Sequence, residues 1–265
     1  MTKKSEKGST IVIILIIIYL LIPLVVSIIY SMFSNWTGIV PKGFTLKTYG
    51  ALFQDHEFLS SLGRTILIAI VPIALTIVLV LLALFVTVIY FPRLEKYVQI
   101  ICMIPYTIQG VILSVSILSL YVANRTFLSN RIIMLIGAYC IIILPYIYQG
   151  IRNGMRAVNM PVLLEAAEML GASRIYAFFR VIVPNILSAI VVSSLLAVGI
   201  IFGDYVLVRN LASSAWPNVQ IYLYQAMKSD SMKSSAVFVV IMAVTFLIAA
   251  IVLYLQSREK KGKKQ

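Results

Sequence analysis

Charged residues are scarce in this sequence, and the residues that build metal sites and disulfides are nearly absent. Only 12% of the 265 residues are charged, whereas a soluble domain carries about 25%. His56 is the single histidine, which argues against a histidine-based metal site and against a Ser-His-Asp triad. Cys102 and Cys140 both lie inside apolar runs, so no disulfide framework is expected. We therefore expect no catalytic residue and no metal ligand in this chain.

Apolar residues dominate instead, at 61% of the sequence. So much apolar surface cannot be hidden in one water-soluble core, and a bilayer must act as its solvent. Each of the apolar runs meets or nearly meets the length of about 20 residues that a membrane-spanning helix needs. The predicted fold is an all-α polytopic membrane protein with about six transmembrane helices. The runs are 11–33, 62–89, 97–121, 131–150, 185–206 and 235–256.

The positive charge indicates how the chain is oriented. A net charge of +13 fits basic residues at cytoplasmic helix ends beside anionic headgroups, and nucleic acid is not an expected partner. With both termini in the cytoplasm, 14 basic residues fall inside and 8 outside. The first run exceeds a signal-peptide core of about 7–15 residues, so it is expected to be retained. The predicted parts are a cytoplasmic N-terminus at 1–10, a transmembrane domain at 11–256 and a basic cytoplasmic tail at 257–265.

The connection at 151–184 has the pattern of a helix–turn–helix. Asn159 can cap a helix and Pro161 suits its first turn. Gly171 can take the left-handed conformation that ends a helix, and Ser173 can cap the next one. The first helix is expected to present a thin apolar ridge that suits a groove on a partner. The ridge consists of Leu163, Ala166, Ala167 and Leu170.

The same stretch resembles the EAA motif of permease subunits in binding-protein-dependent ATP-binding-cassette (ABC) importers. The resemblance rests on Glu165-Ala166-Ala167, then Gly171 and Pro184 at the family's spacing. Val181 and Val183 are conservative departures, since the family has isoleucine or a similar residue and leucine there. The likeness covers roughly residues 60–256. The run Phe202-Gly203-Asp204-Tyr205 looks most like the spermidine/putrescine branch, with ferric-iron and phosphonate permeases similar in this region.

This resemblance implies the partners and the mechanism. In the family, loop helices such as 151–184 couple the permease to a separate ATPase dimer, which uses the ATP. The coupling residues carried over are Leu163, Glu165, Ala166, Ala167, Leu170, Gly171 and Pro184. A second permease subunit, in this branch a different one, and an extracytoplasmic solute-binding protein are implied. The implied location is the bacterial cytoplasmic membrane, and this chain has no phosphate-binding loop and binds no cofactor itself.

Polar residues within predicted spans are candidates for the solute path, because such residues tend to face the protein interior. Tyr106, Gln109 and Ser116 are expected on one face of the third span. Ser193 and Asp204 are expected near one face of the fifth. Asp204 is the only acid in a predicted span; it either lines a path for a cationic solute or pairs with a base such as Arg209 or Arg64.

Other protein classes remain as alternatives. An ion-coupled secondary transporter would favour carboxylates near the midplane and internal repeats. A membrane enzyme would need clustered histidines or acids near one interface. For the loop alone, the alternative is an amphipathic helix lying on the membrane surface. One acid, one histidine and no visible repeat favour the importer permease.

Overall fold

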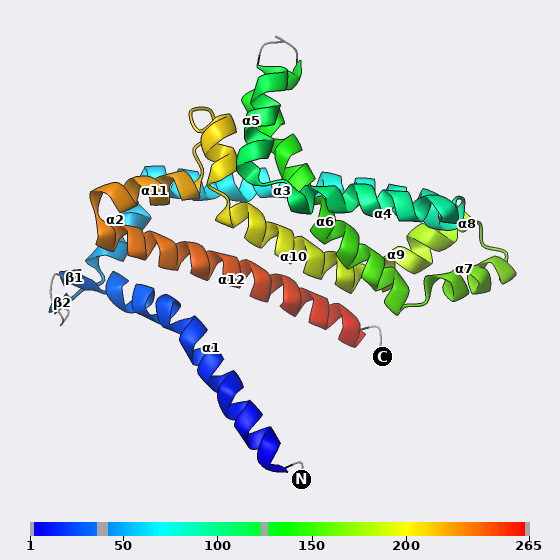
Figure 1. Cartoon of the computed structure of the whole chain (residues 1–265), viewed down its shortest axis with the longest axis horizontal. Helices are drawn as coiled ribbons and strands as arrows, with labels where there is room; N and C mark the ends of the chain where they lie inside the picture. The colour runs from blue at the N-terminus through cyan, green and yellow to red at the C-terminus, as the bar shows by residue number, and fades with distance from the viewer. Residues whose placement is uncertain (1–2, 36–41, 123–126, 263–265) are drawn as a thin grey trace. The chain divides into compact units, whose positions relative to one another are not determined.

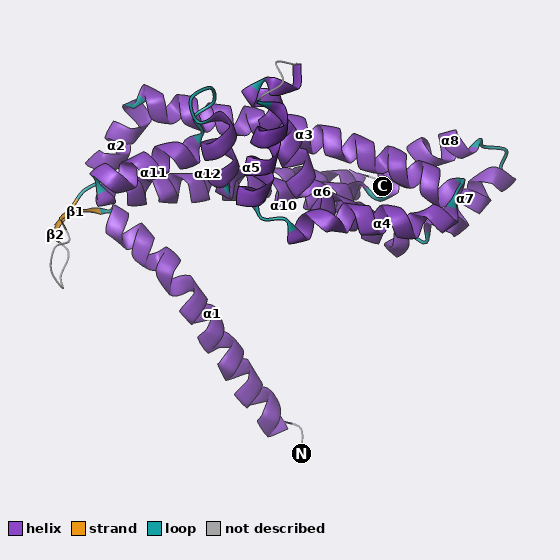
Figure 2. Cartoon of the chain, turned by 45° about the horizontal axis from the view of Figure 1, so that its top comes forward, coloured by secondary structure: helices purple, strands orange, loops and turns teal. Residues whose placement is uncertain are grey.

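The computed structural model describes residues 3–35, 42–122 and 127–262, which are almost entirely helical (Figures 1 and 2). Two compact units can be distinguished, residues 1–59 with 222–244 and residues 60–221 with 245–265, and α3, α11 and α12 contribute to both. The main helices are α1 (Lys3–Ser31), α2 (Lys47–Gln54), α3 (His56–Ile89), α4 (Glu95–Met103), α5 (Gly110–Tyr121), α6 (Arg131–Ala157), α7 (Met160–Met169), α8 (Arg174–Ala177), α9 (Val183–Asn185), α10 (Leu187–Gly203), α11 (Val219–Ser229) and α12 (Ser231–Gly262).

Short elements connect these helices. An antiparallel hairpin of β1 (Phe33–Asn35) and β2 (Lys42–Phe44) follows α1. The 3₁₀ turns are η1 (Pro92–Leu94), η2 (Ile104–Thr107) and η3 (Phe127–Ser129), and the π-helical turns are η4 (Phe178–Ile182) and η5 (Val208–Ala212).

Four helices are long and apolar enough to cross a membrane, and two bent helix pairs raise the number to as many as six. The single helices are Val12–Ser31, His56–Ile89, Arg131–Ala157 and Ser231–Tyr254. They correspond to the first, second, fourth and sixth predicted spans. An all-α polytopic fold is therefore confirmed, and the hydropathy of the sequence explains it.

The third and fifth predicted spans are not continuous helices, which corrects the sequence prediction. Pro92–Thr107 and Gly110–Tyr121 meet at 101°, so α5 stands nearly at right angles to α4 (Figure 1). Pro105 lacks a backbone N–H, and α4 gives way there to the 3₁₀ turn η2. The bend itself follows η2, at Ile108 and Gln109, whose backbones are extended. Arg174–Asn185 and Leu187–Gly203 meet at 64°, after a π-helical turn and Pro184.

The core of the larger unit lies along α6, beside α10. Buried side chains recur every three or four residues of α6, which is the period of one helical face. They include Leu135, Tyr139, Ile143, Ile147 and Ile151, all fully buried. α6 packs against α10 along this face (Figure 1).

Candidate functional site

The predicted helix–turn–helix is present as α7, a tight turn and α8. Gly171 has φ +81°, the left-handed conformation that was predicted for it. The Gly171 and Ala172 amides donate to the carbonyls of Glu168 and Ala167 at 2.9 and 3.0 Å and close the end of α7. Ser173 Oγ accepts from the Tyr176 amide at 3.3 Å and caps α8. The turn is therefore fixed by local backbone chemistry.

Two details of this helix–turn–helix differ from the prediction, one at the start of α7 and one across the turn after it. Asn159 precedes α7 as expected, but it adopts φ 49° and its side chain makes no capping bond. Its carbonyl accepts from the Val162 amide at 3.0 Å, so Asn159 acts as a backbone corner between α6 and α7. An ion pair that was not predicted spans the turn, in which Arg174 Nε donates to Glu168 Oε1 at 2.6 Å.

The apolar ridge predicted on α7 is split between two faces. Ala167 is only 8% exposed, because this side of α7 packs towards η4. Leu163 is half-buried, while Ala166 is exposed. Met169 and Leu170 are 88% and 89% exposed at the carboxyl end of the helix. The exposed face thus consists of Val162, Glu165, Ala166, Met169 and Leu170, and the inclusion of Ala167 in it was wrong.

Pro184 lies in the bent segment that joins the turn to α10. It occupies the first turn of α9, where its missing N–H is tolerated. Phe178, just upstream, is fully buried, and its ring packs edge-on against Phe85 with centroids 5.0 Å apart. The segment after α8 is therefore anchored to α3 within the larger unit.

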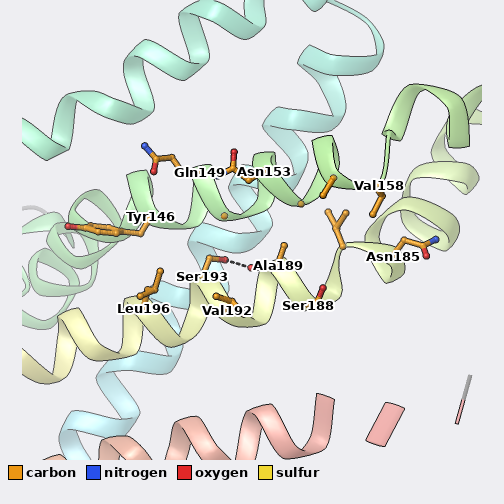
Figure 3. Close-up of a pocket in the computed structure, with 14 residues that line it drawn as sticks. Tyr146, Gln149, Asn153, Val158, Asn185, Ser188, Ala189, Val192, Ser193 and Leu196 are labelled. Carbon is orange, nitrogen blue, oxygen red and sulfur yellow. Dashed lines mark hydrogen bonds between the residues drawn. The ribbon is translucent and has the colours of Figure 1, made fainter. Parts of the chain in front are cut away.

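A groove of about 480 Å³ runs between α6 and α9–α10 (Figure 3). Of the predicted path residues, only Ser193 lines it. Tyr106 does not line the groove but packs on Tyr146, which does, with ring centroids 4.9 Å apart. The lining is mostly apolar, with amide and hydroxyl groups as its polar part, and the lining residues that the structure describes include no charged side chain. The polar lining residues are Tyr146, Gln149, Asn153, Asn185, Ser188 and Ser193.

The shared face predicted for Tyr106, Gln109 and Ser116 does not exist. Tyr106 lies in η2, Gln109 precedes α5 in an extended conformation, and Ser116 lies within α5 beyond the bend. Gln109 and Ser116 are exposed and do not line the groove. The prediction of a shared face assumed one straight helix across the break between Thr107 and Gly110.

Asp204 follows the last residue of α10 instead of lying within the helix. Its carboxylate accepts from Tyr139 Oη at 3.1 Å and from the Leu207 amide at 3.2 Å. Its carbonyl accepts from Asn218 Nδ2 at 3.2 Å. The bond to Tyr139 anchors the segment that follows α10 to α6. Among the described residues, the hydrogen bonds to this carboxylate come from Tyr139 and Leu207 and not from an arginine.

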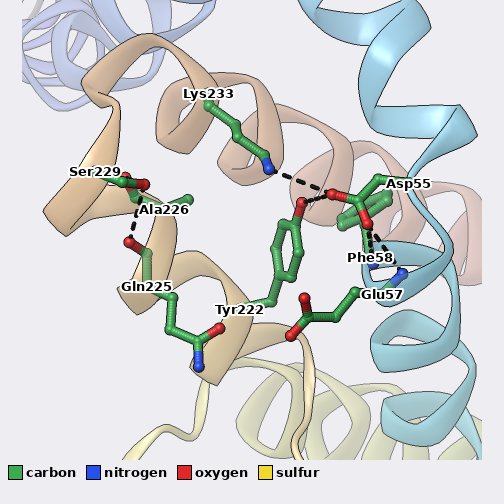
Figure 4. A network of polar contacts seen from close by, with 8 residues as sticks. All are labelled: Asp55, Glu57, Phe58, Tyr222, Gln225, Ala226, Ser229 and Lys233. Atoms are coloured by element: carbon green, nitrogen blue, oxygen red, sulfur yellow. Dashed lines mark hydrogen bonds and ion pairs between the residues drawn. The ribbon is translucent and has the colours of Figure 1, made fainter.

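A second polar cluster lies in the smaller unit and had no signal in the sequence (Figure 4). Asp55 Oδ1 caps α3 by accepting from the amides of Glu57 and Phe58 at 2.9 and 3.3 Å. Its Oδ2 accepts from Tyr222 Oη at 2.5 Å and from Lys233 Nζ at 3.3 Å. The Tyr222 hydrogen bond is the largest cause that lowers the pKa of Asp55, to about 2. The partners lie far away in sequence, so only the fold brings them together.

Comparisons with known proteins agree with this architecture. The model of the family described as "Binding-protein-dependent transport system inner membrane component" matches residues 80–261. The putrescine transport system permease protein PotI of Escherichia coli K12 is 24% identical, over 96% of this chain and 92% of that protein. PotC of Haemophilus influenzae, a spermidine/putrescine transport system permease protein, is 23% identical, over 91% of this chain and 93% of that protein. The putative 2-aminoethylphosphonate transport system permease protein PhnV of Salmonella typhimurium is 18% identical, over 93% of this chain and 92% of that protein.

Solved structures share the fold. A bacterial ABC transporter that imports alginate aligns with a TM-score of 0.72 at 19% identity, covering 96% of both chains. The bacterial alginate ABC transporter in complex with a pentasaccharide-bound periplasmic protein aligns with a TM-score of 0.76 at 18% identity, covering 97% of this chain and 96% of that one.

The helical fold and its apolar spans define a membrane-embedded protein, and the end of α7 is exposed. Because the family model covers well over half of the sequence, the chain belongs to the family of binding-protein-dependent transport system inner membrane components. It is a permease subunit of an ABC importer, and its relatives include the spermidine/putrescine branch.

Proposed function

We propose that this subunit forms a solute path with a second, different permease subunit, and that α7 docks into a separate ATPase dimer. One observation carries the docking assignment, namely the exposure of Met169 and Leu170 at the end of a short, rigidly held helix. Burying an apolar side chain of this kind contributes about 1.5–3 kcal/mol. Two such side chains beside the small Ala166 suit insertion into a cleft on a soluble partner.

In this mechanism the ATPase dimer binds and hydrolyses ATP, and its closure moves α7. An extracytoplasmic solute-binding protein delivers the solute to the permease pair. The residues assigned to the ATPase contact are Glu165, Ala166 and Leu170, with Gly171 and Pro184 holding α7 in position. The excess of basic residues at 151–184 and at the termini supports a cytoplasmic location for this loop and for both chain ends.

The docking assignment is tested by placing a charge at the exposed tip of α7. Leu170→Asp is expected to weaken copurification of the ATPase subunit while leaving the amount of permease in the membrane unchanged. Phe127→Asp is a matched control, because Phe127 is 80% exposed and lies outside the helix pair. Full ATPase binding by Leu170→Asp would refute docking through α7 and would favour a helix that lies on the membrane surface.

The solute is proposed to be a polyamine. The relatives PotI and PotC, whose names refer to putrescine and spermidine transport, support this assignment, and PhnV makes a phosphonate-type solute the second candidate. In proteoliposomes that contain the complete importer and its binding protein, putrescine or spermidine should stimulate ATP hydrolysis. Stimulation by 2-aminoethylphosphonate alone would overturn the polyamine assignment and leave the importer function intact.

A further inference from the structure

The last turns of α6 contact two other helices, α10 and α4. The contact with α10 is made at two glycines. Gly150 and Gly154 have the G-x-x-x-G spacing that lets two helix backbones approach closely in a membrane. A Cβ built on Gly150 would overlap the side chain of Ser193, with its Oγ only 2.9 Å away. A Cβ on Gly154 would overlap the Cβ of Ala189. The two helices therefore cannot slide here without breaking a close-packed contact.

The other direction is set by Arg152, between the two glycines. Its guanidinium forms an ion pair with Oε1 of Glu95, and its Nε donates a hydrogen bond to the same oxygen. The side chains of Arg152 and Glu95 are only 16% and 22% exposed. Glu95 is the first residue of α4, which continues through η2 to the break between Thr107 and Gly110. The pair therefore ties α6 to the first half of the broken third span.

The segment at 150–154, here called the α6 junction, is followed directly by the buried end of α6 and then by α7. Met155 is fully buried and Met160, the first residue of α7, is 2% exposed. Only the corner at Asn159 separates the two helices, and α6 and α7 remain in contact across it. Figure 1 shows α6 running beside α10 before the chain turns into α7. A displacement of α7 would therefore act on the buried end of α6, directly after the α6 junction.

We propose that the α6 junction divides the motion of α7 between two spans, towards α10 through Gly150 and Gly154 and towards α4 through the Glu95–Arg152 ion pair. Glu95 and Arg152 are positioning residues, since neither contacts the ATPase-facing surface of α7. This inference rests on the proposed docking of α7. It predicts that the ion pair affects the coupling of ATP hydrolysis to transport and leaves ATPase binding unchanged.

The test uses the complete importer with Glu95→Gln, Arg152→Gln and the exchanged pair Glu95→Arg/Arg152→Glu. Solute taken up per ATP hydrolysed is measured in proteoliposomes, together with ATPase copurification and membrane abundance. Each single variant should lower the transport ratio about fivefold or more, since coupling between sites usually changes affinities by about 5–150-fold. The exchanged pair should recover much of that loss, because it restores opposite charges at the same positions.

Lys96→Gln is the matched control, because Lys96 lies on the same turn of α4 with an exposed side chain. It should leave the transport ratio unchanged. An unchanged ratio in Glu95→Gln, or an exchanged pair as defective as the single variants at normal abundance, would refute the proposal. Full ATPase binding by Leu170→Asp would instead refute the proposed docking, so the two failures are distinguishable.

Discussion

The turn at Gly171 can be tested by a graded series of substitutions. At φ +81° an L-residue is strained, and the left-handed conformation costs about 1–2 kcal/mol. No atom lies within 4 Å of a Cβ built there, so the cost is in the backbone alone. Asparagine tolerates this region better than alanine, and β-branched valine tolerates it least. A penalty of 1–2 kcal/mol reduces the correctly formed turn by about 5–30-fold relative to its alternatives.

Copurification of the ATPase and solute-stimulated ATP hydrolysis, each normalised to the amount of permease in the membrane, should fall in the order Gly171→Asn, Gly171→Ala, Gly171→Val. Membrane abundance should stay near normal, because the turn lies outside the apolar spans. Glu165→Lys, which alters the exposed face without straining the backbone, separates loss of contact from loss of turn geometry. Equal losses for all three Gly171 variants, or full ATPase binding by Gly171→Val, would refute the strain argument.

Four further tests address other parts of the chain. Gly154→Ala should overlap Ala189 and cost about 1–3 kcal/mol as overpacking; Ala189→Gly in the same chain should restore thermal stability, and no restoration would contradict the close contact. If Asp204 lines a cation path, Asp204→Asn should reduce uptake in an intact complex, whereas unchanged uptake with a destabilised Tyr139→Phe would assign Asp204 to anchoring the segment after α10. The lowered pKa of Asp55 means that its stabilising contribution is present above about pH 4 and is lost as the pH falls towards 2; the difference in thermal stability between the unaltered chain and Asp55→Asn should therefore narrow on acidification, and a constant difference would contradict it. A cysteine at Ala172 should resist membrane-impermeant thiol reagents in intact cells while one at Lys47 is labelled, and the reverse pattern would invert the topology.

The local sequence was sufficient to predict the structure where that structure depends on a few neighbouring residues. Gly171 and Ser173 took the predicted roles because a left-handed glycine and a serine cap act within one turn of the chain. Long helices with an uninterrupted apolar stretch, such as α3 and α12, were also predictable from hydropathy. The misplacement of Ala167 shows the limit, since helical spacing defines a face and only tertiary packing decides which way that face points.

Contacts between distant residues had no local signal. Nothing near Asp55 indicates that Tyr222 and Lys233 will share its carboxylate. Hydropathy likewise treated 97–121 as one span, since averaging over about 20 residues hides a break of a few residues between Thr107 and Gly110. Tyr106, Gln109 and Ser116 were assigned to one helical face because this break was not predicted.

The end of α6 holds several features that were not predicted from the sequence. Hydropathy placed the end of the fourth span at Gly150, because Arg152 and Arg156 follow, but the helix continues to Ala157. Hydropathy reports where apolar surface ends, whereas a helix ends where its backbone hydrogen bonds lose their partners. Glu95 offsets the charge of Arg152 and lets this polar turn remain packed. Asn153 of the groove, Gly154 at the α10 contact and the ion pair all lie in these turns, where the chain passes from apolar span to α7.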